Sequence, residues 1–353
     1  MNGWTSFEEH FPLLAQSLKH AAHTGRLSHS HLIVTSNPDL RLSFPPLLAC
    51  LAACTAPLED GAPCCECETC RMILNGLYPD LFTLAPTSKS RQIQIGKDAD
   101  EPDTLRSFEA AFHLGSVTES GWKIGIIHDA DTMTESAQNA FLKTLEEPSQ
   151  KCLFILVTGR AGGLLPTIRS RCQLIQLTDN HCVYDTELFA PVSTILLDYT
   201  LHGKNDFAVA ERCAGELIDV LDTLSDVAEE TVNKKWESRL KDAENLESAG
   251  VKLLEKRIAG EVSCEYRRLR EHFISYVHAW FAQLAILASG TAKDMLPNPE
   301  VMDAWFNKEE NAKLRPRDVF HMLTEAEELV RSLRTNVNDE LALRAFMLNT
   351  AFH

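Results

Sequence analysis

The chain has 353 residues, of which 44% are hydrophobic and 24% charged, and its formal net charge is −16. This composition excludes extensive disorder, and the length predicts two or three domains because one hydrophobic core rarely organises so many residues. The acidic balance argues against a broad electrostatic hold on nucleic acid, and the lack of a long apolar run or a secretory signal favours a cytoplasmic protein without a membrane partner.

The first half of the chain alternates short β-rich segments with helical patterns. This alternation predicts an α/β domain with a five-stranded parallel sheet covered by helices on both faces. Its strands are predicted at 31–35, 80–84, 123–127, 152–157 and 172–177. A helix is expected between the third and fourth strands, where Ala137, Ala140, Phe141 and Leu145 fall on one helical face and Pro148 ends the element.

Strand signals fade after about residue 178, and long helical patterns follow. These patterns cover 206–224, 264–288, 317–330 and 339–352. The second half of the chain is therefore predicted to be helical.

Residues 29–54 read as a strand, a turn and a helix, which is the setting of a phosphate-binding P-loop. That loop needs G-x-x-x-x-G-K-[ST], because backbone N–H groups must approach the phosphates closely. In this chain Thr35 and Leu40 stand at the two glycine positions, Arg41 at the lysine and Leu42 at the magnesium-binding hydroxyl. The loop is predicted to be degenerate, although a strand, turn and helix that never held nucleotide would give the same stretch.

A second nucleotide element is altered at 123–133. An apolar strand leads to acidic residues there, which is the form of a Walker B strand, but His128 stands at the metal-side acid and Asp129 at the catalytic one. A neutral imidazole is a poor ligand for Mg²⁺, which prefers oxygen. We therefore expect no bound ATP.

Six of the eleven cysteines lie between residues 50 and 70. Four of them have the spacing C-x9-C-x2-C-x2-C: Cys54, Cys64, Cys67 and Cys70. Four thiolates at short separations match the tetrahedral geometry of structural Zn²⁺ and leave no open position for chemistry. Reduced thiols are the alternative, and Cys50 and Cys65 could compete for the metal.

Three segments resemble the bacterial DNA polymerase III clamp loader of the AAA+ superfamily, and among its subunits the delta prime type. They are YPDL at 78–81, HDADTMTESAQNAFLKTLEEP at 128–148 and LLPTIRSRCQLIQL at 164–177. A weaker match follows at 334–348. The resemblance implies an AAA+ domain at 1–178 that contains the zinc module at 54–70, a helical lid at 179–230 and a helical collar at 231–353.

The resemblance also assigns roles to individual residues. Ser170, Arg171 and Cys172 match the Ser-Arg-Cys motif of the family, whose arginine acts as a finger in the ATP site of a neighbouring subunit. A guanidinium suits this role because it stays protonated and can bridge two phosphate oxygens. Thr158 matches the sensor 1 position.

We therefore predict a subunit of the clamp loader in DNA replication that is not an enzyme by itself. Its expected partners are the ATPase subunits and the delta subunit of a hetero-oligomeric ring, with the sliding clamp and primed DNA reached mainly through the complex. The alternatives are an ATP-hydrolysing motor subunit of the same loader and a zinc-dependent DNA-binding protein. The missing glycines oppose the first, and the net charge opposes the second.

Overall fold

The computed structural model describes residues 3–86, 92–99, 101–113, 115–118, 120–178, 184–243, 248–308, 315–333 and 337–352. The chain divides into two compact units, Met1–His181 and Cys182–His353. The first boundary therefore falls close to the expected end of the α/β domain at residue 178.

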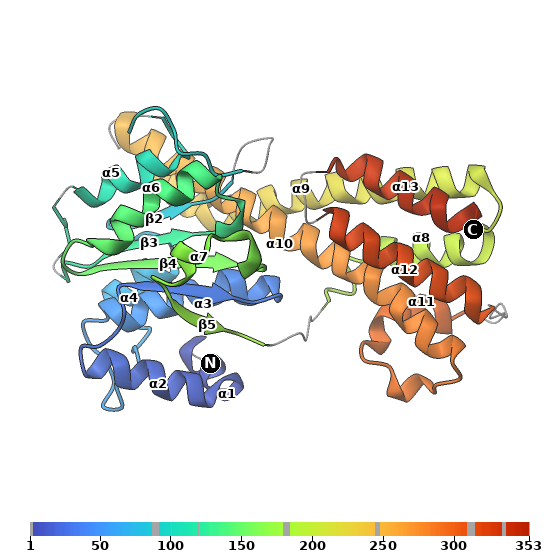
Figure 1. Cartoon of the computed structure of the whole chain (residues 1–353), viewed down its shortest axis with the longest axis horizontal. Helices are drawn as coiled ribbons and strands as arrows, with labels where there is room; N and C mark the ends of the chain where they lie inside the picture. Colours follow the sequence, from blue (N-terminus) through green and yellow to red (C-terminus); the bar gives the residue numbers. More distant parts are fainter. Residues whose placement is uncertain are drawn as a thin grey trace. The chain divides into compact units, whose positions relative to one another are not determined.

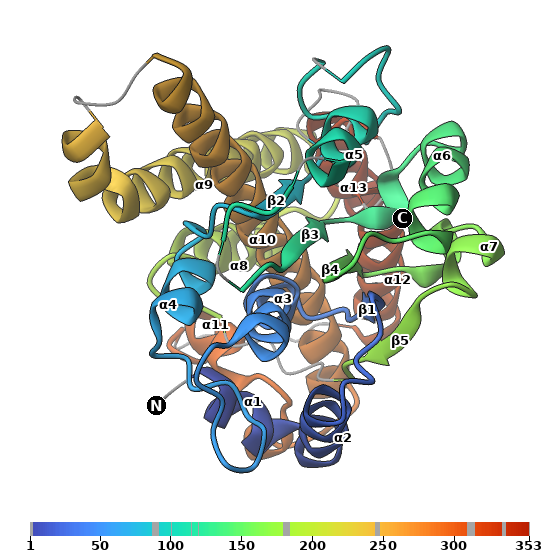
Figure 2. The same cartoon turned by 90° about the vertical axis from the view of Figure 1, so that its left-hand side faces the viewer.

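The first unit contains a parallel sheet of five strands in the order β2-β3-β4-β1-β5 (Figures 1 and 2). Its strands are β1 (Ser30–Val34), β2 (Leu81–Leu84), β3 (Lys123–Ile127), β4 (Cys152–Thr158) and β5 (Gln173–Gln176). All five lie at the predicted positions, and every neighbouring pair is parallel. The predicted α/β class is confirmed.

Helices cover both faces of this sheet (Figure 1). One face packs against α1 (Gly3–His10), α2 (Pro12–His23), α3 (Pro38–Ala53) and α4 (Glu68–Leu74). The other packs against α5 (Leu105–His113), α6 (Glu135–Glu146) and α7 (Pro166–Arg169).

The central strand β4 explains why both faces need a cover. All seven of its residues are buried, and successive side chains alternate between the faces. Ile155 and Val157 join the core beneath α3, whereas Phe154 and Leu156 join the core beneath α6. A strand that is apolar on both sides is stable only between two helical layers.

The segment YPDL ties the starts of two strands together. Asp80 precedes β2, and its Oδ2 accepts hydrogen bonds from the N–H groups of Val117 at 3.0 Å and Thr118 at 3.1 Å. The hydroxyl of the buried Tyr78 donates to the carbonyl of Trp122, just before β3, at 2.9 Å. This family segment therefore fixes the loop that leads into β3.

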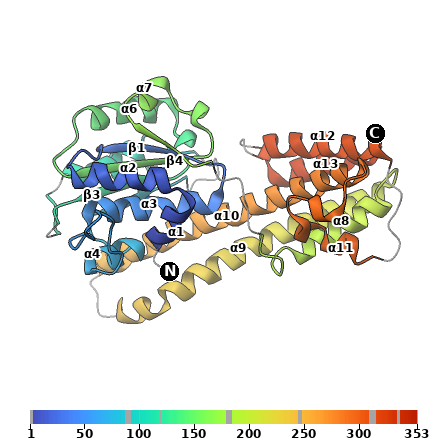
Figure 3. The same cartoon turned by 90° about the horizontal axis from the view of Figure 1, so that it is seen from below.

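The second unit is helical (Figure 3). Its α-helices are α8 (Ala190–His202), α9 (Phe207–Ala243), α10 (Ser248–Ala288), α11 (Asp303–Phe306), α12 (Pro316–Leu333) and α13 (Asp339–Phe352). Short 3-10 helices η1 (Ala130–Thr132) and η2 (Ala161–Gly163) belong to the first unit, and η3 (Lys293–Met295) and η4 (Pro299–Met302) to the second. The second-unit helices share one continuous apolar core.

A buried ion pair links three helices of this unit. Arg270 on α10 contacts both carboxylate oxygens of Asp339 on α13, at 2.9 and 2.6 Å, and donates to the carbonyl of Leu333 on α12 at 3.0 Å. The division into a lid at 179–230 and a collar at 231–353 stays a prediction, and α9 runs without interruption through residue 230. No helix in the described ranges is both long and apolar enough to cross a bilayer.

Candidate functional site

Side chains of the loop after β1 accept hydrogen bonds from backbone N–H groups at the start of α3. The Asn37 carboxamide oxygen accepts from the N–H groups of Asp39 at 2.9 Å and Leu40 at 3.3 Å, and Thr35 Oγ1 accepts from the N–H of Asn37 at 3.2 Å. Asn37 and Thr35 are both buried. Donors that a P-loop would turn toward phosphate therefore already bind side chains of this chain.

Arg41 and Asp129 meet beside this loop. Their Nη1 and Oδ1 atoms lie 3.6 Å apart, and 11% and 20% of the two side chains are exposed. These are the positions aligned with the P-loop lysine and the catalytic acid. Leu42 and His128, aligned with the two magnesium-side groups, are half-buried.

The hydroxyl at the expected sensor 1 position has partners in the same chain. Thr158 Oγ1 donates to Asp131 Oδ1 at 2.6 Å and accepts from the N–H of Arg160 at 2.8 Å. Arg160 Nε lies 3.7 Å from the other Asp131 oxygen. Burial raises the pKa of the Asp131 carboxyl above its ordinary value, although the Thr158 hydrogen bond opposes this shift.

The sheet places Arg171 at the opposite edge from this loop. Thr35 follows the carboxyl end of β1, whereas Arg171 precedes the amino end of β5, which runs parallel to β1 with His31 beside Gln173. Four strand residues separate the two edges by about 13 Å. Arg171 and the loop that follows β1 therefore lie at opposite ends of the strands.

The Arg171 side chain is partly exposed, at 35%. Its Nη2 forms an ion pair with Glu146 Oε1, and its Nη1 donates to the carbonyl of Thr167 at 3.0 Å. Ser170 is exposed and donates to the same carbonyl at 3.1 Å, and Cys172 is buried, which raises the pKa of its thiol to about 11. Of the Ser-Arg-Cys residues, only Arg171 presents a charged group to solvent.

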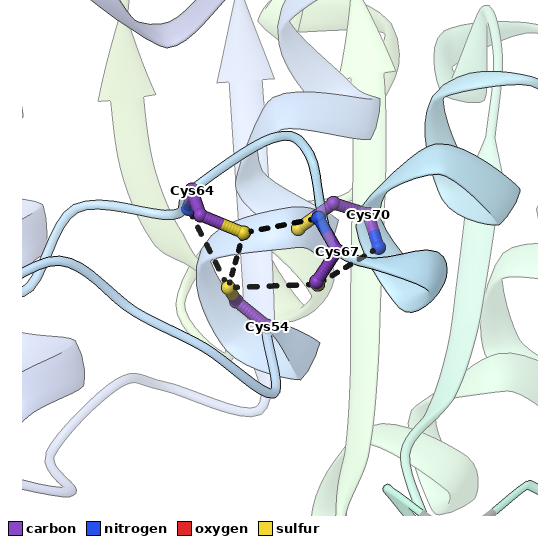
Figure 4. A group of neighbouring side chains, drawn as sticks. All are labelled: Cys54, Cys64, Cys67 and Cys70. Carbon is purple, nitrogen blue, oxygen red and sulfur yellow. Dashed lines mark hydrogen bonds between the residues drawn. The ribbon is translucent and has the colours of Figure 1, made fainter.

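The four predicted cysteines come together at the end of α3 and the start of α4 (Figure 4). The Sγ atoms of Cys54, Cys64, Cys67 and Cys70 all lie within 4.8 Å of one another, and Cys54 Sγ is 3.5 Å from Cys64 Sγ and 4.0 Å from Cys67 Sγ. Tetrahedral zinc with Zn–S bonds near 2.3 Å places its sulfurs about 3.8 Å apart. The donor set and its spacing fit this ion.

Backbone N–H groups support the same sulfurs. Cys67 N–H donates to Cys64 Sγ at 3.2 Å, and Cys70 N–H donates to Cys67 Sγ at 3.4 Å. Cys65 has a positive φ of 56° and lies outside the four-sulfur group, as does the buried Cys50, whose Sγ approaches the Cys70 carbonyl at 3.8 Å. The geometry thus separates the four candidate ligands from the two competitors.

The sequence did not identify several residues of these sites, among them Asn37 and Glu146. Asn37 was detectable, because an asparagine directly before a proline at the start of a helix is a typical N-cap. Glu146 gave no signal, since its partner Arg171 is far away in the sequence and on another element.

The sheet order and the helical second unit define the protein as an α/β domain with a five-stranded parallel sheet followed by a helical region. Residues 12–181 match the family described as DNA polymerase III, delta subunit. Over this part, which is slightly less than half of the chain, the protein is similar to DNA polymerase III subunits of the delta prime type.

Three similar proteins carry the name DNA polymerase III subunit delta prime. The Pseudomonas aeruginosa protein is 31% identical over 150 residues, which is 42% of this chain and 43% of the relative. The Bacillus subtilis protein is 34% identical over 176 residues, 49% of each chain, and the Escherichia coli protein is 40% identical over 121 residues, 34% of each. The chain thus matches half or less of the length of these relatives.

Proposed function

We propose that this protein is a clamp-loader subunit that does not hydrolyse ATP and that supplies Arg171 to the ATP site of a neighbouring subunit. The main support is that Arg171 lies at the opposite edge of the sheet from the loop that follows β1 in the same chain. An arginine in that position can reach a phosphate only when a second protein brings the phosphate to it.

The contacts of the loop support the first half of this proposal. Asn37 caps the helix start, and Arg41 pairs with Asp129. ATP would have to displace a buried side-chain cap, separate an ion pair and recruit Mg²⁺ beside His128. Each of these changes costs free energy, so nucleotide binding is disfavoured.

The chemistry of the guanidinium supports the second half. The Arg171 guanidinium carries five N–H donors in a planar fork. Such a group stabilises the negative charge that develops on the γ-phosphate as its bond breaks, without taking part in covalent chemistry. Its partial exposure leaves it accessible to an incoming ligand.

The partners of this function are the ATPase subunits and the delta subunit of a hetero-oligomeric ring. The sliding clamp and primed DNA are engaged through the assembled complex, because a chain with a net charge of −16 offers little attraction to phosphate on its own. A single Zn²⁺ held by Cys54, Cys64, Cys67 and Cys70 would stabilise the loop between α3 and α4, with no catalytic role.

Reconstituted clamp loader with Arg171→Ala tests the finger. We expect the DNA- and clamp-stimulated ATPase rate to fall by a factor on the order of 10³, with normal assembly by gel filtration. Arg169→Ala is the matched control, since Arg169 is an exposed arginine at the end of α7, two residues before Arg171. Normal turnover of the Arg171 variant would refute the assignment.

Calorimetry on the isolated protein tests whether this chain binds ATP itself. Titration with ATP and Mg²⁺ should give no heat of binding at micromolar concentrations. Magnesium-dependent micromolar binding would refute the non-ATPase role and favour a motor subunit.

A further inference from the structure

The guanidinium of Arg171 is held on two sides within its own chain. Glu146 contacts Nη2 and the Thr167 carbonyl accepts from Nη1, so two of the five N–H donors are directed inward. The remaining donors are available to a ligand that approaches the exposed part of the side chain.

His29 and Ser30 hold the two backbone segments that carry Glu146 and Arg171. His29 Nε2 lies 3.0 Å from the carbonyl oxygen of Leu145, the residue before Glu146. Ser30 Oγ donates to the carbonyl of Arg171 itself at 2.7 Å. Because Ser30 is buried at the start of β1, the end of α6 and the start of β5 are both fastened to the same edge of the sheet.

We propose that Glu146 is a positioning residue for Arg171. This inference rests on the proposed function, because it assumes that Arg171 meets a phosphate of a neighbouring subunit. An unrestrained arginine samples many rotamers, and a reacting group that is displaced by about 1 Å loses much of its effect. The carboxylate of Glu146 and the Thr167 carbonyl together restrict the guanidinium to one orientation.

The solvent exposure of the Arg171–Glu146 ion pair determines how much its loss should change stability and turnover. The Glu146 side chain is 48% exposed and the Arg171 side chain 35%. An ion pair of this kind contributes little to folding, so its loss should leave stability unchanged and alter turnover by about two- to fivefold. This is far less than the loss of Arg171 itself.

The test compares Glu146→Ala, Glu146→Gln and Glu147→Ala in the reconstituted loader. Glu146→Ala should lower kcat about two- to fivefold and leave the KM for ATP unchanged, because the nucleotide binds to the neighbour. Glu146→Gln keeps an acceptor oxygen and should recover most of the rate. Glu147→Ala removes the same charge from the adjacent exposed residue and should have no effect.

A double-variant cycle separates this inference from the proposed function. If Glu146 acts through Arg171, Glu146→Ala should cause no further loss in an Arg171→Ala background. A full additional loss in that background, an unchanged rate of the single variant or a faster one would each overturn the positioning role. Full activity of Arg171→Ala would instead refute the finger itself.

Discussion

Arg41 and Asp129 form an ion pair beside the loop that follows β1, with Nη1 and Oδ1 3.6 Å apart. In an ATP-hydrolysing relative, the residues aligned with them would contact phosphate and polarise water. Here they neutralise each other, and the pair joins the start of α3 to the end of β3.

Arg41→Met should therefore destabilise the protein rather than alter a catalytic step. We expect the free energy of unfolding to fall by about 1–3 kcal/mol, because the variant removes the cation beside a largely buried carboxylate. Urea titration followed by circular dichroism measures this change. Arg169→Met, which alters an exposed arginine, should be neutral, and equal stabilities of both variants would show that the pair contributes nothing.

The cysteine cluster should contain a single zinc ion per chain when the protein is purified without chelator. Cys64→Ser should remove the metal and lower the melting temperature, since a structural zinc site contributes its binding free energy to folding. Elemental analysis and thermal denaturation report the two effects. Cys65→Ser should keep the metal, and its loss from that variant would show that the ligand set is different.

His31 should make stability depend on pH. It is completely buried in β1, and this burial lowers its pKa from 6.5 to about 4. Between pH 6.5 and 4 the unfolded chain binds a proton that the folded chain does not bind, so stability falls as the pH falls. The total loss is about 3 kcal/mol, is complete below pH 4 and disappears above pH 7.

Urea titrations from pH 4 to 8 measure this dependence. His31→Leu should flatten the curve over this range because the titrating group is gone. A variant whose stability changes with pH as steeply as that of the parent protein would assign the effect to other groups.

Gly125 in the middle of β3 should not tolerate a side chain. A Cβ atom there would lie 2.5 Å from Phe108 Cζ and 2.7 Å from Phe112 Cζ, which is far inside contact distance. Gly125→Ala should destabilise the protein by about 1–3 kcal/mol through overpacking. Gly162→Ala is the control, because its Cβ would meet no atom within 4 Å, and thermal denaturation of the two variants provides the comparison.

Local patterns predicted most of the fold. The five strands have apolar runs, and α6 has both an amphipathic pattern and a side-chain cap from Thr134. The length of α9 was not predicted, since the 206–224 pattern covers only its first half. Its later residues are mainly polar, and periodicity alone does not show that a helix continues through them.

The sequence by itself determined which chemical groups this protein has and which it lacks. It has no glycine at the two P-loop positions, four cysteines at metal-ligand spacing and the arginine of Ser-Arg-Cys. Only the tertiary structure decided which of these groups meet. It paired Arg41 with Asp129 and Arg171 with Glu146, and it placed the two pairs at opposite edges of one sheet. The physical reason is that both pairs join residues far apart in the sequence. Sequence periodicity reports only neighbours along one helix or strand, whereas these contacts depend on strand order and register.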